Sequence, residues 1–424
     1  MAALCLLGAA LAGVLKIDAQ ASSDMPSYDI VKIMNPIWEG KTSYMESVLV
    51  VENEYGGIDP IQLLYPVEEI VEVKNAELSK TYQKGVDYTV AGGKLIIADD
   101  GDIPTLSYEE FHPTTGEHGF QDQDGKYICF HEGDFFHKRQ IVVTYTHTAE
   151  YEGYIPEAKG NLLPKVTEKL QNGEDLDLLV FGDSISVGAN SSGFVGVAPY
   201  MPTYPKLFAD HLQLVYGSKV NLINPSVGGK GVEWGLEEID GILATRKHLD
   251  LAIIAFGMND GNMTPTKFAA KTAQLTEKVK GKFPEAEIML IATMLPNPDA
   301  KFFHLNQEKF HDALVEMVEE EGIAVVNVTD VHASLLQRKR YADMTGNNVN
   351  HTNDYMARVY AQTLFATLQK KTETDEPSSM DEGEKQQYAS IFGLLSGCNS
   401  TASLAIGGTA LGAATIALKK KKDD

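Results

Sequence analysis

The chain has 424 residues, more than one hydrophobic core usually holds, and this length suggests about two domains with accessory segments. With 43% hydrophobic and 22% charged residues, its composition is close to that of globular proteins and argues against wholesale disorder. The formal net charge of −23 argues against a nucleic-acid partner, because proteins bind phosphate backbones through basic surfaces. The acidity identifies no substrate, since a solvated, self-repelling surface accounts for it.

The N-terminal segment, residues 1–21, has the features of a signal peptide. Its apolar run over residues 4–15 is too short to cross a bilayer comfortably, and Ala19-Gln20-Ala21 forms an A-x-A cleavage pattern. No Lys or Arg precedes the apolar run, which departs from the usual signal-peptide pattern. The alternative is an ordinary buried helix.

Residues 25–160 are predicted to form an all-β accessory domain, a small β-sandwich. The chain up to about Thr148 contains short runs typical of strands, and Gly92-Gly93 between two of them is typical of a tight hairpin turn. Tyr and Phe residues around the runs suit a sandwich interior. The predicted strands cover residues 47–52, 68–73, 87–91, 94–98 and 140–148.

Two features of this domain suggest ligands, and for each the structural interpretation is preferred. Aromatic side chains such as Trp38 or Tyr55 could stack on sugars, but an aromatic residue in a β-domain is more often part of the core. The segment Asp122–Gly125 resembles the opening of a calcium loop, but the remaining ligand positions of that motif are missing. We therefore expect a polar turn there and assign no sugar site to the aromatic residues.

Residues 161–370 are predicted to form an α/β domain. From about Leu163, apolar strands alternate with amphipathic stretches, which is typical of a parallel sheet with crossover helices. Open sheets of this kind bind ligands at the carboxyl ends of their strands, so polar residues that directly follow a strand are candidates for the site. The predicted strands cover residues 176–181, 219–224, 249–256, 287–295 and 322–328.

Polar segments follow three of these strands, and a fourth stands near the end of the domain. Ser184 follows the first strand at a strand-to-helix turn, where its hydroxyl and backbone N–H can both face a ligand. The glycine-rich segment 224–231 follows the second strand and lets backbone N–H groups approach a substrate closely. Asn259 follows the third strand with an amide that can donate to an oxyanion, and His351 precedes a helical stretch.

In this order and at these strand ends, the segments resemble the blocks of the SGNH hydrolases, the GDSL esterase/lipase family, over about residues 175–368. Each residue alone is better explained as a helix cap, a turn glycine or a surface side chain, so the ordered set is the signal. The resemblance implies a flavodoxin-like parallel sheet, with Ser184 as nucleophile and His351 as general base. It also implies an oxyanion hole made of the N–H of Ser184, the N–H of Gly229 and the side chain of Asn259.

The choice of Gly229 depends on counting within the family pattern. The family's glycine stands five positions after the residue represented here by Asn224, which selects Gly229. The adjacent Gly228 is the alternative oxyanion donor.

The position of the catalytic acid departs from the family. The acid normally lies three residues before the histidine, and this chain has Asn348 there. An asparagine can accept an N–H bond and fix the tautomer of His351, but it cannot offset the imidazolium charge that forms during attack. Asn348 is the third predicted catalytic residue, with Asp343, Asp354 or a backbone carbonyl as alternatives.

The C-terminal part is predicted to be a linker followed by a membrane anchor. Residues 371–400 begin with an acidic stretch that contains Pro and Ser, which indicates a solvated linker. Residues 401–422 join an apolar run of small residues to a cluster of lysines, a stop-transfer pattern. With a cleaved leader, the positive-inside rule then places the rest of the chain at the outer surface of a bacterial-type cell membrane. A short Gly/Ala-rich helix without a membrane is the alternative.

The three cysteines, Cys5, Cys129 and Cys398, show no CxxC spacing, so neither a disulfide framework nor a metal site is predicted. Cys398 follows small residues in a segment that resembles the C-terminal anchor signals of some bacterial proteins. Processing or lipid attachment at Cys398 is therefore a hypothesis.

Together these features predict a serine esterase that hydrolyses acyl esters, with O-acetyl groups on carbohydrate as the first hypothesis. A β-sandwich before an SGNH domain resembles the architecture of bacterial carbohydrate esterases, which implies an acylated small molecule or polysaccharide as substrate. The chemistry requires no metal and no cofactor. The alternative is a surface glycan-binding protein that is catalytically weak or inactive, because Asn348 stands in the place of the acid.

Overall fold

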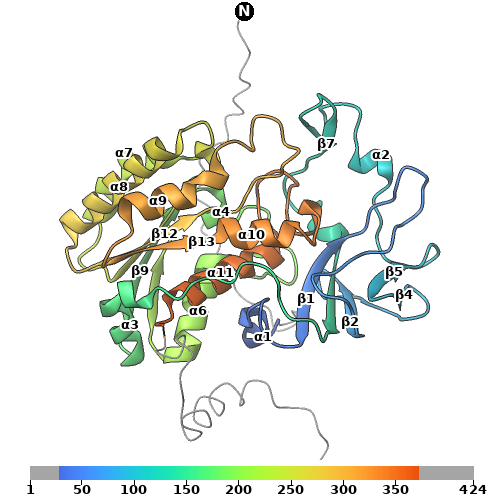
Figure 1. The fold of residues 1–424 in the computed structure, drawn as a ribbon, viewed down its shortest axis with the longest axis horizontal. Coiled ribbons are helices and arrows are strands. Elements are labelled where there is room, and N and C mark those ends of the chain that lie inside the picture. The colour runs from blue at the N-terminus through green and yellow to red at the C-terminus, as the bar shows by residue number, and fades with distance from the viewer. Residues whose placement is uncertain (1–27, 372–424) are drawn as a thin grey trace, which may run out of the picture. The chain divides into compact units, whose positions relative to one another are not determined.

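Figure 1 shows the structure, a computed structural model that describes residues 28–371 of the chain. The predicted signal peptide (1–21) and the predicted membrane anchor (401–422) lie outside the described residues, as does the predicted linker (371–400) apart from its first residue. Among residues 28–371, no helix combines the length and the apolar character needed to cross a membrane.

A five-stranded parallel sheet forms the centre of the second half of the described chain. Its order, β10-β9-β11-β12-β13, is that of a flavodoxin-like fold and confirms the predicted α/β domain. Because β10 pairs with one edge of β9 and β11 with the other, the carboxyl end of β9 lies at the topological switch point, where such sheets bind ligands. Each strand overlaps a predicted one: β9 (Leu176–Gly182), β10 (Val220–Ile223), β11 (Leu251–Ala255), β12 (Glu287–Ala292) and β13 (Ile323–Asn327).

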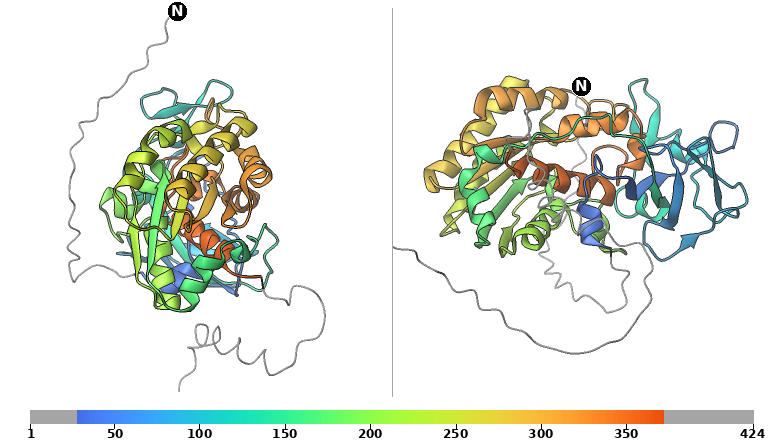
Figure 2. Two further views of the ribbon diagram at one scale, coloured as in Figure 1. Left: turned by 90° about the vertical axis from the view of Figure 1, so that its left-hand side faces the viewer. Right: turned by 60° about the horizontal axis from the view of Figure 1, so that its bottom comes forward.

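Helices cover both faces of this sheet (Figures 1 and 2). Successive residues of β9 alternate between two hydrophobic clusters: Leu178 and Val180 pack with α3, α6, α10 and α11, and Leu179 and Phe181 pack with α7, α8 and α9. Burial on both faces explains why β9, β11, β12 and β13 are apolar at nearly every position, whereas the edge strand β10 is only partly buried. The helices are α3 (Pro164–Gln171), α6 (Tyr204–Tyr216), α7 (Val232–Ala244), α8 (Pro265–Lys282), α9 (Phe310–Val318), α10 (Val328–Leu336) and α11 (Asp354–Leu368).

The first part of the described chain is a β-domain, as predicted. A four-stranded antiparallel sheet in the order β1-β8-β2-β3 is joined by two hairpins, β4-β5 and β6-β7. Gly92 and Gly93 form the two-residue loop between β4 and β5, with the positive φ angles of 58° and 74° that this hairpin turn requires. The strands are β1 (Thr42–Leu49), β2 (Glu69–Asn75), β3 (Thr81–Tyr82), β4 (Tyr88–Ala91), β5 (Lys94–Ile97), β6 (Gly119–Gln121), β7 (Tyr127–Cys129) and β8 (Gln140–Thr146).

Of the features of the β-domain that suggested ligands, the segment Asp122–Gly125 forms a turn, Trp38 is buried and Tyr55 is exposed. Asp122 Oδ1 accepts from the backbone N–H groups of Asp124 at 3.0 Å and Lys126 at 2.7 Å, which confirms the polar turn between β6 and β7. Trp38 is buried at 7% exposure, as expected, but Tyr55 is 86% exposed, so the prediction of a core position is wrong for Tyr55.

Short helical turns complete the described chain. Four have α geometry: α1 (Ile30–Met34), α2 (Tyr108–Phe111), α4 (Ser184–Val187) and α5 (Ser192–Val195). The others are 3-10 turns: η1 (His137–Arg139), η2 (Gly160–Leu162), η3 (Met258–Asp260), η4 (Gln307–Lys309) and η5 (Tyr341–Asp343).

One hydrophobic core runs through the β-domain and the α/β domain. Val143 and Tyr145 on β8 belong to the same buried cluster as Tyr355 and Val359 on α11. The amide of Gln362 on α11 donates to the carbonyl oxygens of Ile33 and Asn35 and so holds α1 against the same helix. The two domains are therefore packed together as one unit.

A buried ion pair lies within this shared core. Lys339 Nζ, after α10, lies 2.6 Å from Glu46 Oε1 on β1, and both side chains have no exposed surface. Glu46 also accepts from the N–H of Leu64 at 2.9 Å and from the hydroxyl of Tyr145 at 2.7 Å, and Lys339 donates to the carbonyl of Ser47. Both charges are thus compensated by hydrogen bonds, as buried charges must be.

Lys339→Met is expected to lower the free energy of unfolding by about 3–5 kcal/mol, because it leaves the Glu46 carboxylate buried without its partner. Urea denaturation followed by circular dichroism measures the change. Adding Glu46→Gln to the variant should recover part of the loss. The exposed Lys247 is the control position, where Lys247→Met should change the unfolding free energy by less than about 0.5 kcal/mol. Equal stability of the two single variants would contradict the expectation.

Candidate active site

Ser184 stands at the carboxyl end of β9, where the predicted strand-to-helix turn is found. It is the first residue of α4, and Asp183 caps this turn by accepting from the N–H of Ile185 at 3.0 Å. The turn needs glycine at position 182, because a Cβ there would lie 2.4 Å from the carbonyl oxygen of Ala255 on β11. Ser184 is only 5% exposed, so its hydroxyl is held in a largely desolvated position.

His351 lies beside Ser184 although the two are far apart in the sequence. The distance between His351 Nε2 and Ser184 Oγ is 3.0 Å. The loop that carries His351 is closed on itself, because Asn347 Oδ1 accepts from the backbone N–H groups of Val349, Asn350 and His351 at 3.0 Å each. The predicted nucleophile and base are therefore within hydrogen-bonding distance and on a rigid support.

The other ring nitrogen of His351 is held by Asn190, which the sequence did not indicate. Asn190 Nδ2 donates to the carbonyl of Gly133 at 3.0 Å, and this bond turns its Oδ1 toward His351 Nδ1 at 2.5 Å. Nδ1 therefore carries the proton, and Nε2 is left to accept from the Ser184 hydroxyl. Asn190 is 3% exposed and has a φ of 67°, a conformation that asparagine tolerates better than most residues.

A carboxylate of the β-domain also reaches His351. Glu132, in the segment after β7, has its Oε2 at 3.3 Å from His351 Nδ1, while its side chain stays 55% exposed. Burial raises the pKa of Glu132, but the hydrogen bond and charge of His351, together with hydrogen bonds from Asn347 and Asn190, outweigh it and leave the pKa below its usual value. Glu132 is consequently ionised at neutral pH.

The structure corrects the expectation that Asn348 orients the histidine. The chain passes through Asn348 with a positive φ of 65°, and its Nδ2 donates to the carbonyl of Cys129 at 3.0 Å. Its Oδ1 accepts from Asn297 at 3.3 Å, so both ends of the amide are used away from the His351 ring. Asn348 thus joins the loop of His351 to β7.

The two aspartates considered as alternatives are also engaged elsewhere. Asp343 pairs with Arg340 at 2.8 Å and accepts from the N–H of Leu49. Asp354 accepts from the N–H of Ser192 at 2.8 Å. Asn190 follows Ser184 closely in the sequence, so its position offered a weak signal, whereas 215 residues separate Glu132 from its partner Asn347 and no sequence pattern indicates their contact.

Of the predicted oxyanion loops, the glycine loop passes beside Ser184 and the Asn259 turn is bonded to the glycine loop. A Cβ placed on Gly228 would lie 3.6 Å from Ser184 Cβ, whereas one on Gly229 would have no atom within 4 Å. Gly229 has a φ of 72°, which only glycine adopts readily. Asn259, in η3, donates through Nδ2 to the carbonyl of Lys230 at 2.9 Å and so joins the third loop to the second. By this measure Gly228, the alternative, passes closer to Ser184 than Gly229 does.

Two buried aspartates, Asp260 and Asp183, accept hydrogen bonds from the backbone of these loops. Asp260 Oδ1 accepts from the N–H of Val232 at 3.0 Å, and its Oδ2 has no hydrogen-bond partner among the described residues. Burial raises the pKa of Asp260 to about 6, and burial together with the nearby Asp260 raises the pKa of Asp183 to about 7. The turn of Ser184 thus packs on two acids that keep their protons to a higher pH than ordinary aspartates do.

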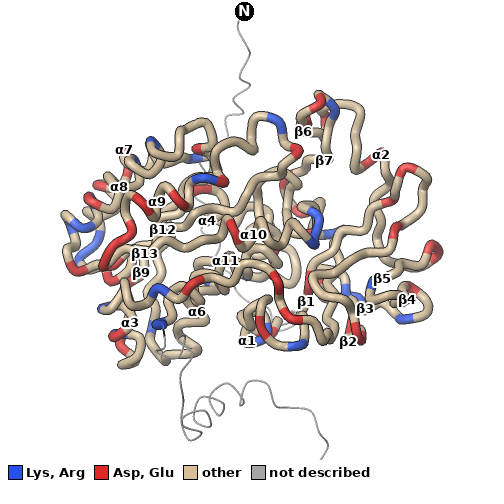
Figure 3. The backbone as a smooth tube through the Cα atoms, in the orientation of Figure 1, with Lys and Arg blue, Asp and Glu red and all other residues tan. Residues whose placement is uncertain are grey.

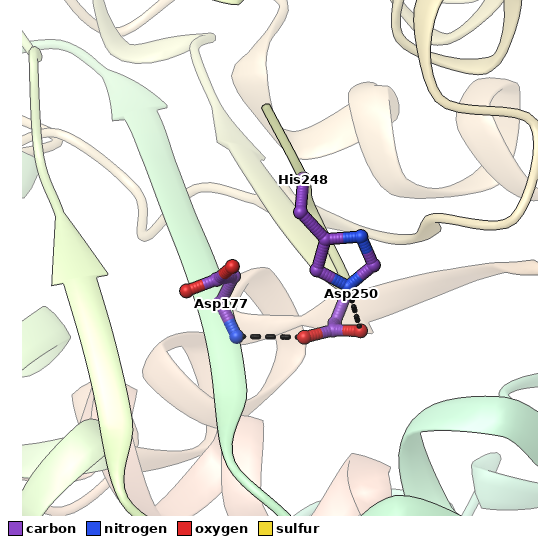
Figure 4. Close-up of side chains that lie close together, drawn as sticks. All are labelled: Asp177, His248 and Asp250. Carbon is purple, nitrogen blue, oxygen red and sulfur yellow. Dashed lines mark hydrogen bonds and ion pairs between the residues drawn. The ribbon is translucent and has the colours of Figure 1, made fainter. Parts of the chain in front are cut away.

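A separate cluster of acidic and histidine side chains lies at the amino ends of the strands (Figure 4). Asp250 accepts from His248 Nε2 at 2.8 Å and from the N–H of Asp177 at 2.7 Å. The ammonium of Lys169 lies 2.7 Å from the same Asp250 carboxylate and already supplies its positive charge. The cluster is therefore an ion-pair network, and we assign no metal to it.

Comparison with known proteins identifies the family of the second domain. Residues 180–359 match the model of the GDSL-like lipase/acylhydrolase family, and no curated protein sequence matches the chain. A parallel sheet with a serine after its first strand and a histidine before its last helix defines an SGNH-type hydrolase domain. Residues 180–359 thus form a GDSL-like lipase/acylhydrolase domain, and this domain makes the chain a carboxylic ester hydrolase.

Several solved structures are similar to parts of the chain. A two-domain esterase active on acetylated mannans is 19% identical with a TM-score of 0.42, and the match covers 54% of this chain and 59% of that one. An acetyl-xylooligosaccharide esterase from Geobacillus stearothermophilus is 17% identical with a TM-score of 0.39, covering 47% of this chain and 97% of that one. An aryl esterase from M. smegmatis is 16% identical with a TM-score of 0.36, covering 45% and 96%.

Asp183→Asn is expected to change how stability depends on pH. The folded chain raises the pKa of Asp183 from 3.8 to about 7, so it holds the proton more tightly than the unfolded chain, and ionisation costs stability as the pH rises through this range. The asparagine keeps an oxygen that can accept from Ile185 but has no proton to lose. The unfolding free energy of Asp183→Asn, taken relative to that of the wild type, should therefore rise by a few kcal/mol between about pH 4 and pH 8.

Urea unfolding at several pH values measures this difference. Ser79→Ala, at an exposed position, is the control and should show a difference from wild type that does not vary with pH, because it removes no ionisable group. A pH-independent difference for Asp183→Asn would contradict the assignment of a raised pKa to Asp183.

Proposed function

We propose that the chain is a serine esterase that hydrolyses acyl esters, with O-acetyl esters of carbohydrate as its substrates. The observation that carries the proposal is the 3.0 Å contact between Ser184 Oγ and His351 Nε2. The proton on His351 Nδ1 is committed to Asn190, so Nε2 is the free base. Nucleophile and base thus have the protonation states that acyl transfer needs.

The reaction follows from this arrangement. As Ser184 Oγ attacks the ester carbonyl carbon, His351 Nε2 takes the hydroxyl proton, and the oxyanion is stabilised by the N–H of Ser184, an N–H of the Gly228–Gly229 turn and the Asn259 side chain. The imidazolium then protonates the departing alcohol. Water attacks the acyl-serine, gives its proton to Nε2, and releases the carboxylic acid with the serine restored.

Two features support a neutral carbohydrate ester as substrate. A β-domain precedes the hydrolase domain, as in the architecture of carbohydrate esterases that the sequence resembles. Acidic residues are spread over both domains (Figure 3) and identify no substrate by themselves, but the Glu132 carboxylate stands exposed beside the base. A carboxylate in this position repels anionic acyl donors and leaves neutral O-acetyl sugars unaffected.

We also propose that the enzyme works at the outer surface of a bacterial-type membrane. This proposal rests on the sequence, in which residues 1–21 resemble a leader and residues 401–422 a stop-transfer segment followed by lysines. The acidic linker would then hold the hydrolase away from the membrane.

A glycan-binding protein without efficient turnover is the second candidate function. It is favoured by one observation, that the position of the usual acid holds Asn348. In that case the β-domain would recognise the glycan and the hydrolase domain would serve as a scaffold.

Hydrolysis of 4-nitrophenyl acetate and release of acetate from acetylated xylan test the proposal. We expect Ser184→Ala to lower kcat by at least about 10³-fold, because the nucleophile is removed. Ser79→Ala, at an exposed position of the β-domain, should keep wild-type activity. Equal rates for wild type and Ser184→Ala would exclude the esterase, and glycan retention without turnover would favour the binding protein.

A further inference from the structure

The catalytic centre described above lacks a charge in the usual place. When His351 accepts the serine proton it becomes an imidazolium, and a nearby carboxylate normally stabilises this ion. Asn190 fixes the tautomer of His351 but is neutral, and Asn348 faces away from the ring. Among residues 28–371, Glu132 is the one carboxylate that lies within 4.0 Å of a His351 ring nitrogen.

We propose that Glu132, contributed by the β-domain, supplies the negative charge that stabilises the His351 imidazolium. The inference rests on the proposed esterase function and concerns the same site. Asn190 Oδ1 accepts the hydrogen bond from the Nδ1–H of His351 at 2.5 Å, and Glu132 acts through its charge at 3.3 Å, so two residues share the work of one triad acid. The β-domain is then part of the catalytic centre as well as an accessory domain.

The segment that carries Glu132 is fixed to the catalytic loops at three points. Asn347 Nδ2 donates to Glu132 Oε1 at 3.2 Å. The next residue, Gly133, accepts from Asn190 at 3.0 Å. The carbonyl of Cys129, three residues before Glu132, accepts from Asn348 Nδ2 at 3.0 Å. A single segment of the β-domain therefore positions both the charge and the amide that face His351.

The number of hydrogens available around His351 Nδ1 supports this division of roles between Asn190 and Glu132. Asn347 Nδ2 lies 3.0 Å from His351 Nδ1, but its two hydrogens are used by Glu132 Oε1 and Asn350 Oδ1. Nδ1 therefore carries its own hydrogen and donates it in a hydrogen bond to Asn190 Oδ1. The Glu132 carboxylate is left with an oxygen directed at the ring edge, where the positive charge of the imidazolium develops.

The exposure of Glu132 sets the size of the effect. With 55% of its side chain exposed, water and salt screen its charge, so its contribution is smaller than that of a buried triad acid. We expect Glu132→Gln to lower kcat about fivefold at low salt, which corresponds to a screened charge pair. KM should stay close to the wild-type value, because Glu132 acts on the transition state through His351.

The test uses the full chain purified in mild detergent, with 4-nitrophenyl acetate as substrate and NaCl varied from low concentration to about 1 M. The wild-type kcat should fall with salt toward the value of Glu132→Gln, and the variant should be nearly insensitive to salt. Asp134→Asn is the matched control: it removes a carboxylate of the same segment that pairs with Lys138 and should keep the wild-type kcat and salt dependence.

Three results distinguish the possibilities. A wild-type protein whose turnover does not depend on Ser184 removes the esterase function and this inference together. An active wild type with an equally active Glu132→Gln overturns the role of Glu132 and leaves the esterase intact. A loss in Glu132→Gln that is the same at low and high salt, or that is shared by Asp134→Asn, indicates a structural effect and also overturns the inference.

Discussion

The ammonium of Lys339 and the carboxylate of Glu46 meet at 2.6 Å with no exposed surface, one from the α/β domain and the other from the β-domain. Separating the domains would break this ion pair and expose the apolar surface around it to water, which costs free energy. The hydrophobic cluster shared by β8 and α11 adds to this restraint. Because the domains are fixed in this way, the segment from Cys129 to Gly133 is held against the loop of His351.

The site is therefore assembled from two kinds of support. The parallel sheet brings Ser184, the Gly228–Gly229 turn and Asn259 together, because the carboxyl ends of adjacent parallel strands lie along one edge. The environment of the base comes from elsewhere: Asn190 follows α4, and Glu132 belongs to the β-domain. In the mechanism that we propose, a neutral amide and an exposed carboxylate together take the role of the acid that is missing at position 348.

Much of the fold was predictable because its signals are local. All five parallel strands appear in the sequence as apolar runs; both faces of β9, β11, β12 and β13 are buried, whereas the edge strand β10 is only partly buried. The long strands of the β-domain and the Gly92-Gly93 hairpin were also predicted. The strands β3, β6 and β7 were missed, since runs of two or three residues are too short to show alternation. Tyr55 was misjudged, because burial of a single aromatic residue depends on distant packing.

For the candidate catalytic centre, the sequence by itself predicted Ser184 as nucleophile and His351 as base, since they stand in an ordered pattern relative to strands and helix, and the structure places the two side chains 3.0 Å apart. It also showed that the usual acid is absent at Asn348. Only the tertiary structure decided what faces His351 Nδ1. Asn190 lies 161 positions away from His351 in the sequence, and Glu132 belongs to the other domain. The pattern of apolar residues in a strand indicates which faces of the strand are buried. It does not indicate which side chain faces a ring nitrogen, because that depends on how distant segments pack together.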